Sequence, residues 1–168
     1  LAEGCILADY RFNLLRSGKE AERALLTVRM PGHAEAVTRA LAVARAQNLA
    51  RELADTPPNL LNPKTFAERA KVECRRVKLG CTVLSGTVAL RKARFFGLAQ
   101  VGQAGSTEPA LVEITYTPRQ ARRGAPHLHL VGKGITFDTG GISLKPGDKM
   151  WEMKGDMGGA AAVLGAMT

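Results

Sequence analysis

The sequence predicts an α/β protein with a mostly parallel sheet flanked by helices, preceded by a linker and a connecting helix. Two helical patterns fill residues 33–54 and 62–79, and a further helix begins near residue 157. Between them lie short apolar segments bounded by glycine and proline, which are typical of strands. Helices before and between strands favour a parallel sheet covered by helices.

The first predicted helix covers residues 33–54, where apolar side chains return at helical spacing among Ala, Arg and Glu. The sequence Asp-Thr-Pro-Pro at 55–58 stops it. Asn62 then fits an N-cap with Pro63 in the first helical position, and this second helix ends before Gly80. We therefore expect two successive helices ahead of the sheet.

The predicted strands are the apolar segments after Gly80, at residues 81–84, 96–101, 111–116 and 128–131. Residues 1–32 contain several glycine and proline breaks and are predicted to be a linker or the end of an N-terminal domain. Residues 33–168 form the second unit, which begins with the connecting helix.

Composition excludes several classes of protein. Of the 168 residues, 45% are hydrophobic and 23% are charged, which is the average for globular proteins. No apolar run approaches the roughly 20 residues of a membrane span, and no signal peptide is evident, so we expect a soluble, intracellular protein. Three cysteines without a C-x-x-C pair indicate neither a disulfide framework nor a thiolate zinc site. The chain begins without Met and stops inside an apolar helical pattern, so we expect an internal fragment.

The net charge of +9 is concentrated in the middle of the chain. Residues 58–125 hold 12 Lys and Arg against 4 Asp and Glu, and the flanking segments are nearly neutral. Such a patch can bind phosphates, but no zinc-finger spacing or RNA-recognition motif accompanies it, and aromatic residues make up 5% of the chain. A solvated or subunit-facing surface is the favoured interpretation over nucleic-acid binding.

Residues 131–159 place eight glycines around Lys133, Asp138, Lys145 and Asp156. Glycine permits close backbone approach, and sites in parallel sheets lie at the carboxyl ends of strands, where residues 128–131 would deliver Lys133 and Asp138. Carboxylates are hard ligands for divalent cations. A lysine held beside a dication can lose its proton and become a ligand, whereas a charged lysine can stabilise an oxyanion.

The motifs Val-Gly-Lys-Gly-Ile-Thr-Phe-Asp-Thr-Gly-Gly-Ile-Ser-Leu-Lys-Pro at 131–146 and Met-Lys-Gly-Asp-Met-Gly-Gly-Ala-Ala at 153–161 closely resemble the leucyl (cytosol) aminopeptidase family. The resemblance implies the first part of a metallopeptidase catalytic domain. It further implies a cytoplasmic homo-hexamer that releases leucine and other apolar N-terminal residues from peptides by metal-activated hydroxide attack. Two divalent ions per complete subunit are implied, Zn²⁺ or Mn²⁺, with Mg²⁺ as a further candidate.

The resemblance also assigns roles to five residues of this sequence. Lys133 and Asp156 match ligands of one metal, and Asp138 matches the carboxylate that bridges both metals. Lys145 matches the catalytic lysine, and Met153 matches the pocket for the first substrate side chain, with Lys145 and Asp138 also facing the substrate.

The family completes its site with a later Asn-Thr-Asp-Ala-Glu-Gly-Arg segment, which supplies two more carboxylates and a catalytic arginine. Residues 1–168 contain no such segment. We therefore predict that this chain alone is inactive.

Other interpretations of the same residues compete with the metal site. Taken singly, Asp138 could serve a turn and Asp156 could cap a helix. His127 and His129 would share one face of a strand, but no third zinc ligand stands at suitable spacing. Asp138-Thr139-Gly140 spells an aspartic-protease signature, which needs a second such carboxylate, and Gly132-Lys133 lacks the rest of a phosphate loop. A non-catalytic homologue acting as a binding module, for DNA among other ligands, is the alternative function.

Overall fold

The computed structural model describes residues 1–17 and 29–168. The helices and strands along the chain are α1 (Ala2–Ala8), α2 (Ala34–Asp55), α3 (Pro63–Arg76), β1 (Gly80–Ser85), α4 (Thr87–Lys92), α5 (Phe96–Gly102), β2 (Ala110–Thr115), the 3₁₀ helix η1 (Met150–Gly155) and α6 (Gly158–Met167). No helix in the described residues is long and apolar enough to cross a membrane.

The predicted helices are confirmed, and local signals explain their ends. α2 stops at Asp55, directly before Thr56 and two prolines. The side chain of Asn62 accepts hydrogen bonds from the backbone N–H groups of Lys64 and Thr65, and Thr65 Oγ1 accepts one from the Asn62 N–H. This capping box satisfies helix donors that would otherwise lack partners, and so it fixes the start of α3.

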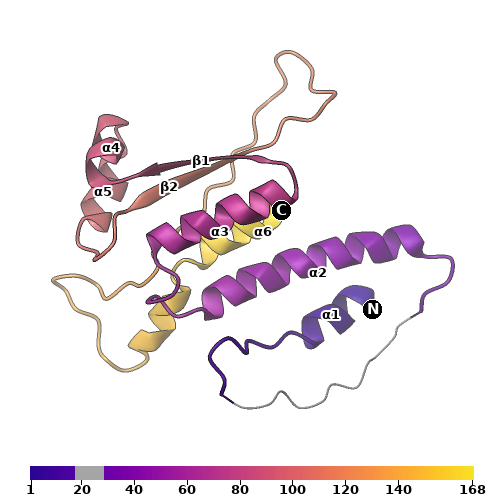
Figure 1. The fold of residues 1–168 in the computed structure, drawn as a ribbon, viewed down its shortest axis with the longest axis horizontal. Coiled ribbons are helices and arrows are strands. Elements are labelled where there is room, and N and C mark those ends of the chain that lie inside the picture. The colour runs from indigo at the N-terminus through magenta and orange to yellow at the C-terminus, as the bar shows by residue number, and fades with distance from the viewer. Residues whose placement is uncertain (18–28) are drawn as a thin grey trace.

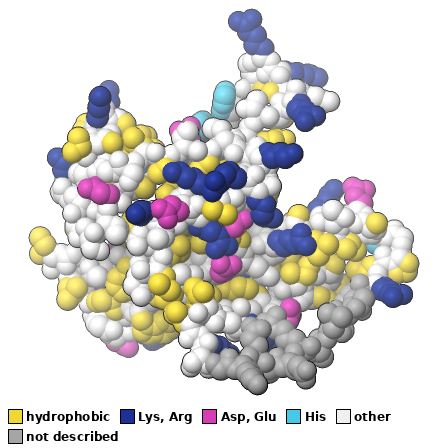
Figure 2. Space-filling view, viewed as in Figure 1, with side chains coloured by type: hydrophobic (Ala, Val, Ile, Leu, Met, Phe, Trp, Pro, Cys, Tyr) yellow, Lys and Arg dark blue, Asp and Glu magenta, His cyan; other side chains and the backbone are white. Residues whose placement is uncertain are grey.

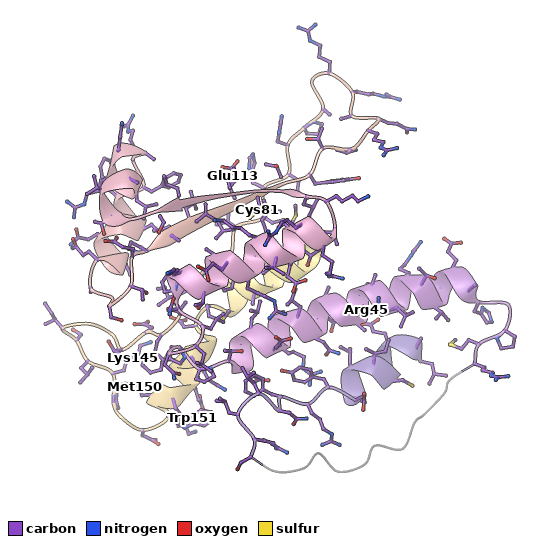
Figure 3. The ribbon with its side chains drawn as sticks, in the orientation of Figure 1. Arg45, Cys81, Glu113, Lys145, Met150 and Trp151 are labelled. Carbon is purple, nitrogen blue, oxygen red and sulfur yellow. The ribbon has the colours of Figure 1, made fainter. Side chains whose placement is uncertain are left out.

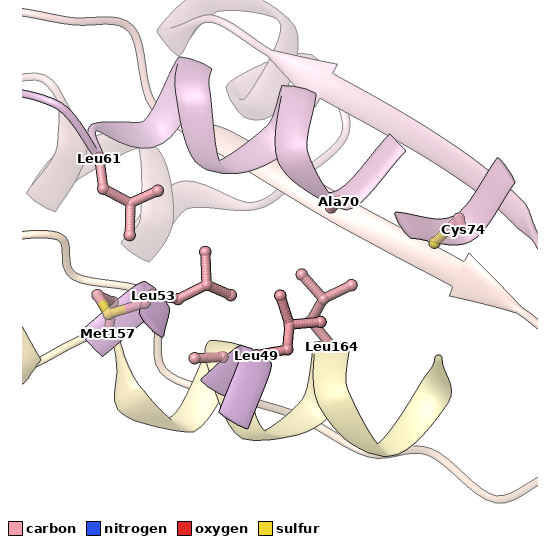
Figure 4. Close-up of a cluster of buried hydrophobic side chains, with 8 residues drawn as sticks. Leu49, Leu53, Leu61, Ala70, Cys74, Met157 and Leu164 are labelled. Atoms are coloured by element: carbon pink, nitrogen blue, oxygen red, sulfur yellow. The ribbon is translucent and has the colours of Figure 1, made fainter. Parts of the chain in front are cut away.

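The core lies where α2, α3 and α6 meet beneath the strand pair (Figure 1). Leu53 and Leu164 are 1% and 2% exposed and contribute the largest side chains from α2 and α6. Around them, Figure 4 shows the side chains of the same cluster, which comprises Leu49, Leu53, Leu61, Ala70, Cys74, Met157, Ala161 and Leu164. This core joins α6 to elements about one hundred residues earlier in the chain.

The α/β class is confirmed, but the expected mostly parallel sheet is not found in the described residues, where the two strands pair antiparallel. β1 and β2 pair antiparallel, with Gly80 opposite Thr115 and Ser85 opposite Ala110. The connection through α4 and α5 leaves and returns at the same end of the pair, where the Gly86 N–H donates to the Pro109 carbonyl at 2.9 Å. A chain that returns at the same end must run antiparallel, so no parallel pairing occurs in residues 1–17 and 29–168.

Two predicted strands are wrong, and the segment expected to be a linker or the end of an N-terminal domain contains a helix. Residues 96–101 form α5 instead of a strand, because a short apolar run fits either structure when its period is not decisive. Residues 128–131 form no strand and have no ladder partner among the described residues, so Val131 remains 92% exposed. Within the predicted linker, α1 packs along α2, and residues 18–28 lie outside the described part.

The basic middle segment is most prominent in the loop that follows β2. Arg119, Arg122 and Arg123 are exposed there, and Figure 2 shows the dark blue side chains on this projecting loop. The loop stands away from the helical layers in Figure 1.

Candidate metal centre

The five residues singled out by the sequence form two neighbouring lysine–carboxylate groups. Lys145 Nζ lies 2.8 Å from Asp138 Oδ2 and 3.0 Å from Met153 Sδ. Lys133 Nζ lies 2.7 Å from Asp156 Oδ1. The charge of Lys133 also acts on Asp138, so the two groups share one electrostatic environment.

Close backbone approach places Lys133 beside the start of α6. The Lys133 carbonyl accepts a hydrogen bond of 2.8 Å from the Ala160 N–H. A Cβ on Gly132 would collide with the Gly159 backbone, and a Cβ on Gly159 would lie 2.9 Å from the Lys133 nitrogen. Only paired glycines allow these backbones to meet at this distance. Their contact brings Lys133 within reach of Asp156, which lies two residues before the helix.

A tight loop returns Lys145 to Asp138. Asp138 Oδ1 accepts from the Gly140 N–H at 2.8 Å, and the Lys145 N–H donates to the Thr139 carbonyl at 2.9 Å. Gly140 has φ +88°, a region that side chains disfavour, and a Cβ there would collide with the Ser143 carbonyl. The glycine after the Asp-Thr dipeptide is therefore needed to close the loop on its own carboxylate.

The 3₁₀ helix η1 supplies the opposite wall. It carries Met153, and the Asp156 N–H donates to the Met153 carbonyl at 3.2 Å immediately after it. Figure 3 shows Lys145 beside Met150 and Trp151 of η1, beyond the C-terminal end of α2. One short turn thus provides both the apolar side chain at Lys145 and the carboxylate at Lys133.

The electrostatics of the site favour an ionised Asp138. The hydrogen bond from Lys145 lowers the pKa of the Asp138 carboxyl, and the Gly140 N–H and the charges of Lys145 and Lys133 lower it further. The carboxyl is therefore an anion at neutral pH. An anion flanked by two cations can accept a metal when the lysines move aside or lose their protons.

Asp156 provides the test of whether these residues fit a metal ion. Its Oδ2 atom is buried and has no hydrogen-bond partner among the described residues. A buried carboxylate oxygen without a partner is costly, and coordination of a cation would satisfy it. Oxygen ligands from Asp138 and Asp156 together with a lysine nitrogen suit a divalent ion.

The imidazoles do not join this centre. His127 and His129 stack on each other with ring centroids 6.3 Å apart in the exposed segment before Val131. No cluster of three or more His, Cys, Asp and Glu side chains that could hold a metal occurs in residues 1–17 and 29–168. The candidate centre therefore contributes two carboxylates and lysines.

Sequence reasoning does not anticipate one residue beside the site. Lys154 lies between Met153 and Asp156, yet its Nζ reaches the Asp55 carbonyl at 2.9 Å, 99 residues away. Its position inside the second motif is the one signal that points to it.

Comparison with known proteins finds a family match that includes both motifs of the candidate centre. Residues 48–168 match the model of the cytosol aminopeptidase family, catalytic domain. A probable cytosol aminopeptidase of Roseiflexus castenholzii is 43% identical, over 99% of this chain and 36% of that protein. One of Mycobacterium tuberculosis is 44% identical, over 99% of this chain and 34% of that protein. The chain therefore spans about a third of the length of the curated relatives it matches.

Solved structures agree with this match. The bottromycin maturation enzyme BotP in complex with Mn has a TM-score of 0.84 at 40% identity, covering 98% of this chain and 34% of that one. The cytosol aminopeptidase from Coxiella burnetii has a TM-score of 0.83 at 29% identity, covering 98% and 34%. Because the matched family model covers most of the chain and includes both motifs, this chain belongs to the cytosol aminopeptidase family.

Proposed function

We propose that the complete protein is a metal-dependent aminopeptidase that releases leucine and other apolar residues from the N-termini of peptides. The carrying observation is the buried, unpartnered Asp156 Oδ2 beside Lys133, next to the group formed by Lys145, Asp138 and Met153 in the described part of the chain. Membership of the aminopeptidase family gives this arrangement its reaction class.

Lys133, Asp138 and Asp156 are the residues of this chain that would contribute to holding two divalent ions in the complete subunit, together with the two later carboxylates that the resemblance implies. Zn²⁺ and Mn²⁺ are the proposed ions, with Mg²⁺ as a third candidate, and the similar enzyme BotP has been solved in complex with Mn. When bound, such ions supply Lewis-acid polarisation and lower the pKa of a coordinated water. To act as a ligand, Lys133 would present a neutral Nζ, with its proton given up to solvent.

Lys145 has a different proposed role, that of the catalytic lysine. Its ammonium group would bind the carbonyl oxygen of the scissile peptide and stabilise the negative charge that develops there. Asp138 orients Lys145 through the 2.8 Å contact. Met153 touches the same ammonium group and offers an apolar, adaptable surface to the first side chain of the peptide, which supports a preference for leucine.

The remaining properties follow from the family resemblance. We propose a cytoplasmic homo-hexamer that acts on peptides, in keeping with relatives that are named cytosol aminopeptidases. Residues 1–168 alone are proposed to be inactive, because the resemblance places two more carboxylate ligands and an arginine in a later segment.

Hydrolysis of leucine p-nitroanilide by the complete protein tests the proposal. We expect turnover with Mn²⁺ or Zn²⁺, loss of turnover with EDTA, and loss after Asp138→Asn. Lys149→Met is the matched control, because Lys149 is an exposed lysine in the same loop as Lys145 and has no part in the proposed mechanism. Activity that persists in EDTA and in the Asp138→Asn variant would overturn the metallopeptidase assignment.

A further inference from the structure

The C-terminal end of α2 is fastened to η1 by one lysine. Lys154 Nζ donates to the Asp55 carbonyl at 2.9 Å and lies 3.9 Å from Asp55 Oδ1. The last carbonyls of a helix lack intrahelical donors, and the negative end of the helix dipole attracts a cation. Lys154 therefore caps α2 from a position 99 residues later in the chain.

Asp55 is itself held from the N-terminal segment. The Tyr10 hydroxyl donates to Asp55 Oδ2 at 2.8 Å, and the Arg51 guanidinium lies 4.1 Å above the Tyr10 ring. Arg51 also donates to the Leu7 carbonyl at 2.8 Å. These contacts fix the orientation of the Asp55 carboxylate, so Lys154 meets a preformed acceptor.

The position of η1 determines the geometry of the candidate metal centre. Met153 and Lys154 are adjacent in this six-residue helix, and Asp156 follows its last residue. Met153 touches Lys145, and Asp156 touches Lys133. Since so short a helix moves as a unit, a shift at Lys154 would displace both side chains together.

We propose that Lys154 and Asp55 are positioning residues that tether η1 to α2 and so place Asp156 and Met153 for metal and substrate. This inference rests on the proposed metallopeptidase function. Loss of a residue that orients a metal ligand typically lowers metal affinity about 10- to 100-fold, and we expect a loss of that size for Lys154→Met.

The test compares five forms of the complete protein: wild type, Lys154→Met, Lys154→Arg, the control Lys149→Met and the ligand variant Asp156→Asn. Binding of Mn²⁺ is followed by the electron paramagnetic resonance signal of the free ion. Hydrogen exchange of peptides covering 150–156 is measured without metal, kcat and KM are measured with leucine p-nitroanilide, and a thermal scan checks folding.

For Lys154→Met we expect Mn²⁺ affinity to fall about 10- to 100-fold, with faster exchange at 150–156. Both kcat and KM should change, because Asp156 and Met153 move together. Arginine keeps the cation and the donors, so Lys154→Arg should restore most of the affinity, and Lys149→Met should match wild type.

Unchanged Mn²⁺ affinity and exchange in a folded Lys154→Met variant would overturn the tether while leaving the proposed function intact. The same holds if Lys154→Met and Lys149→Met lose affinity equally. A wild type that binds no Mn²⁺ or Zn²⁺ would instead overturn the proposed function and, with it, this inference. If Lys154→Met fails to fold, a Lys154→Arg affinity as low as that of Asp156→Asn overturns the tether, and near-wild-type binding supports it.

Discussion

Lys145 Nζ lies 2.8 Å from Asp138 Oδ2, because the loop that joins the two residues turns back at Gly140, whose φ is positive. The contact pairs the group proposed to stabilise the oxyanion with the carboxylate proposed to bridge the metals. Under the proposed function, Lys145 and a metal ion would compete for the same oxygen in the complete protein. Substitutions of the two partners should therefore have opposite effects on metal binding.

Lys145→Met should abolish most turnover without weakening metal binding. Loss of a group that stabilises an oxyanion costs about 10²- to 10³-fold in kcat, and methionine keeps much of the apolar stem. Removing the competing cation leaves Asp138 free, so Mn²⁺ affinity should stay equal or rise. Steady-state kinetics and a Mn²⁺ titration of the complete protein check both parts, and a fall in affinity would contradict the competition.

Asp156→Asn should reduce the stabilisation that metal ions give to the folded protein, because Asp156 is proposed as a ligand of one of the two ions. Wild type at a metal concentration of 100 times Kd gains about 2.7 kcal/mol, and EDTA should abolish that gain. The variant loses the charged ligand of one ion, so Mn²⁺ should raise its thermal midpoint over the EDTA value by less than it does for wild type. Without metal the variant should unfold near the wild-type midpoint, because a neutral amide replaces the carboxylate whose Oδ2 is buried. A variant that Mn²⁺ stabilises as much as it stabilises wild type would show that Asp156 is not a ligand.

Glu73 is a buried acidic residue that joins neighbouring positions on α3. Arg69 Nε lies 2.8 Å from Oε1, and Arg76 Nε lies 3.1 Å from Oε2. Glu73→Gln should lower the free energy of unfolding by about 1–2 kcal/mol, since both arginines are partly exposed and recover some hydration. The matched control is Glu35→Gln, whose pair with Arg39 is 80% to 93% exposed and should contribute within about 0.5 kcal/mol.

The same residue predicts an acid dependence. Burial raises the pKa of the Glu73 carboxyl, but hydrogen bonds and charge from Arg69 and Arg76 outweigh burial and hold the pKa below its usual value. A lowered folded-state pKa gives stability that is present above the unfolded value of about 4.3 and is lost as pH falls through the folded value. The difference in stability between wild type and Glu73→Gln should shrink as the pH falls below about 4.3. A difference in thermal midpoint that stays constant over this pH range would contradict the prediction.

Cys74 should make the fold sensitive to alkali. Burial, and then the neighbouring Cys81, raise the pKa of the Cys74 thiol to about 11. In the unfolded chain the pKa of this thiol is about 8.5. The stability that the buried neutral thiol contributes is therefore complete below that pH and is lost as the pH rises toward the folded-state pKa. In urea unfolding between pH 7 and pH 11, the difference in free energy of unfolding between wild type and Cys74→Ala should shrink as the pH rises. Parallel curves over that range would contradict this assignment.

Local signals explain why the helices could be predicted while the sheet could not. The Asn62 cap and Pro63 define the start of α3 within four residues, so no tertiary information is needed. The strand order depends on the connection at 86–109, where residues 96–101 have the apolar pattern of a strand and in fact form α5. Once that connection is helical and returns to its starting end, the antiparallel pairing follows, which the sequence pattern alone does not indicate.

In the candidate site too, the residues within the motifs could be predicted from the sequence, whereas a contact between distant segments could not. Glycines and carboxylates in two motifs predict a metal centre, and the structure brings Asp138 to Lys145 and Asp156 to Lys133. The contact from Lys154 to Asp55 spans 99 residues and has no periodic or compositional signature. Such a contact follows only from the packing of η1 against the end of α2.

Two glycines of α6 should respond to alanine with opposite signs. A Cβ on Gly165 would lie 2.6 Å from the Ala46 carbonyl oxygen of α2, whereas a Cβ on Gly158 would meet no described atom within 4 Å. Alanine favours a helix over glycine by up to about 1 kcal/mol, so Gly158→Ala should stabilise the protein.

For Gly165→Ala the same propensity gain is outweighed, because backbone atoms of α2 would have to shift. Overpacking of this kind costs about 1–3 kcal/mol, so the variant should unfold at lower urea than wild type. Urea midpoints of the two variants, measured side by side in the complete protein, provide the comparison. If both alanines stabilise, the close crossing of α2 and α6 at Ala46 is wrong. If both variants are less stable than wild type, the higher helix propensity of alanine does not stabilise the first turn of α6.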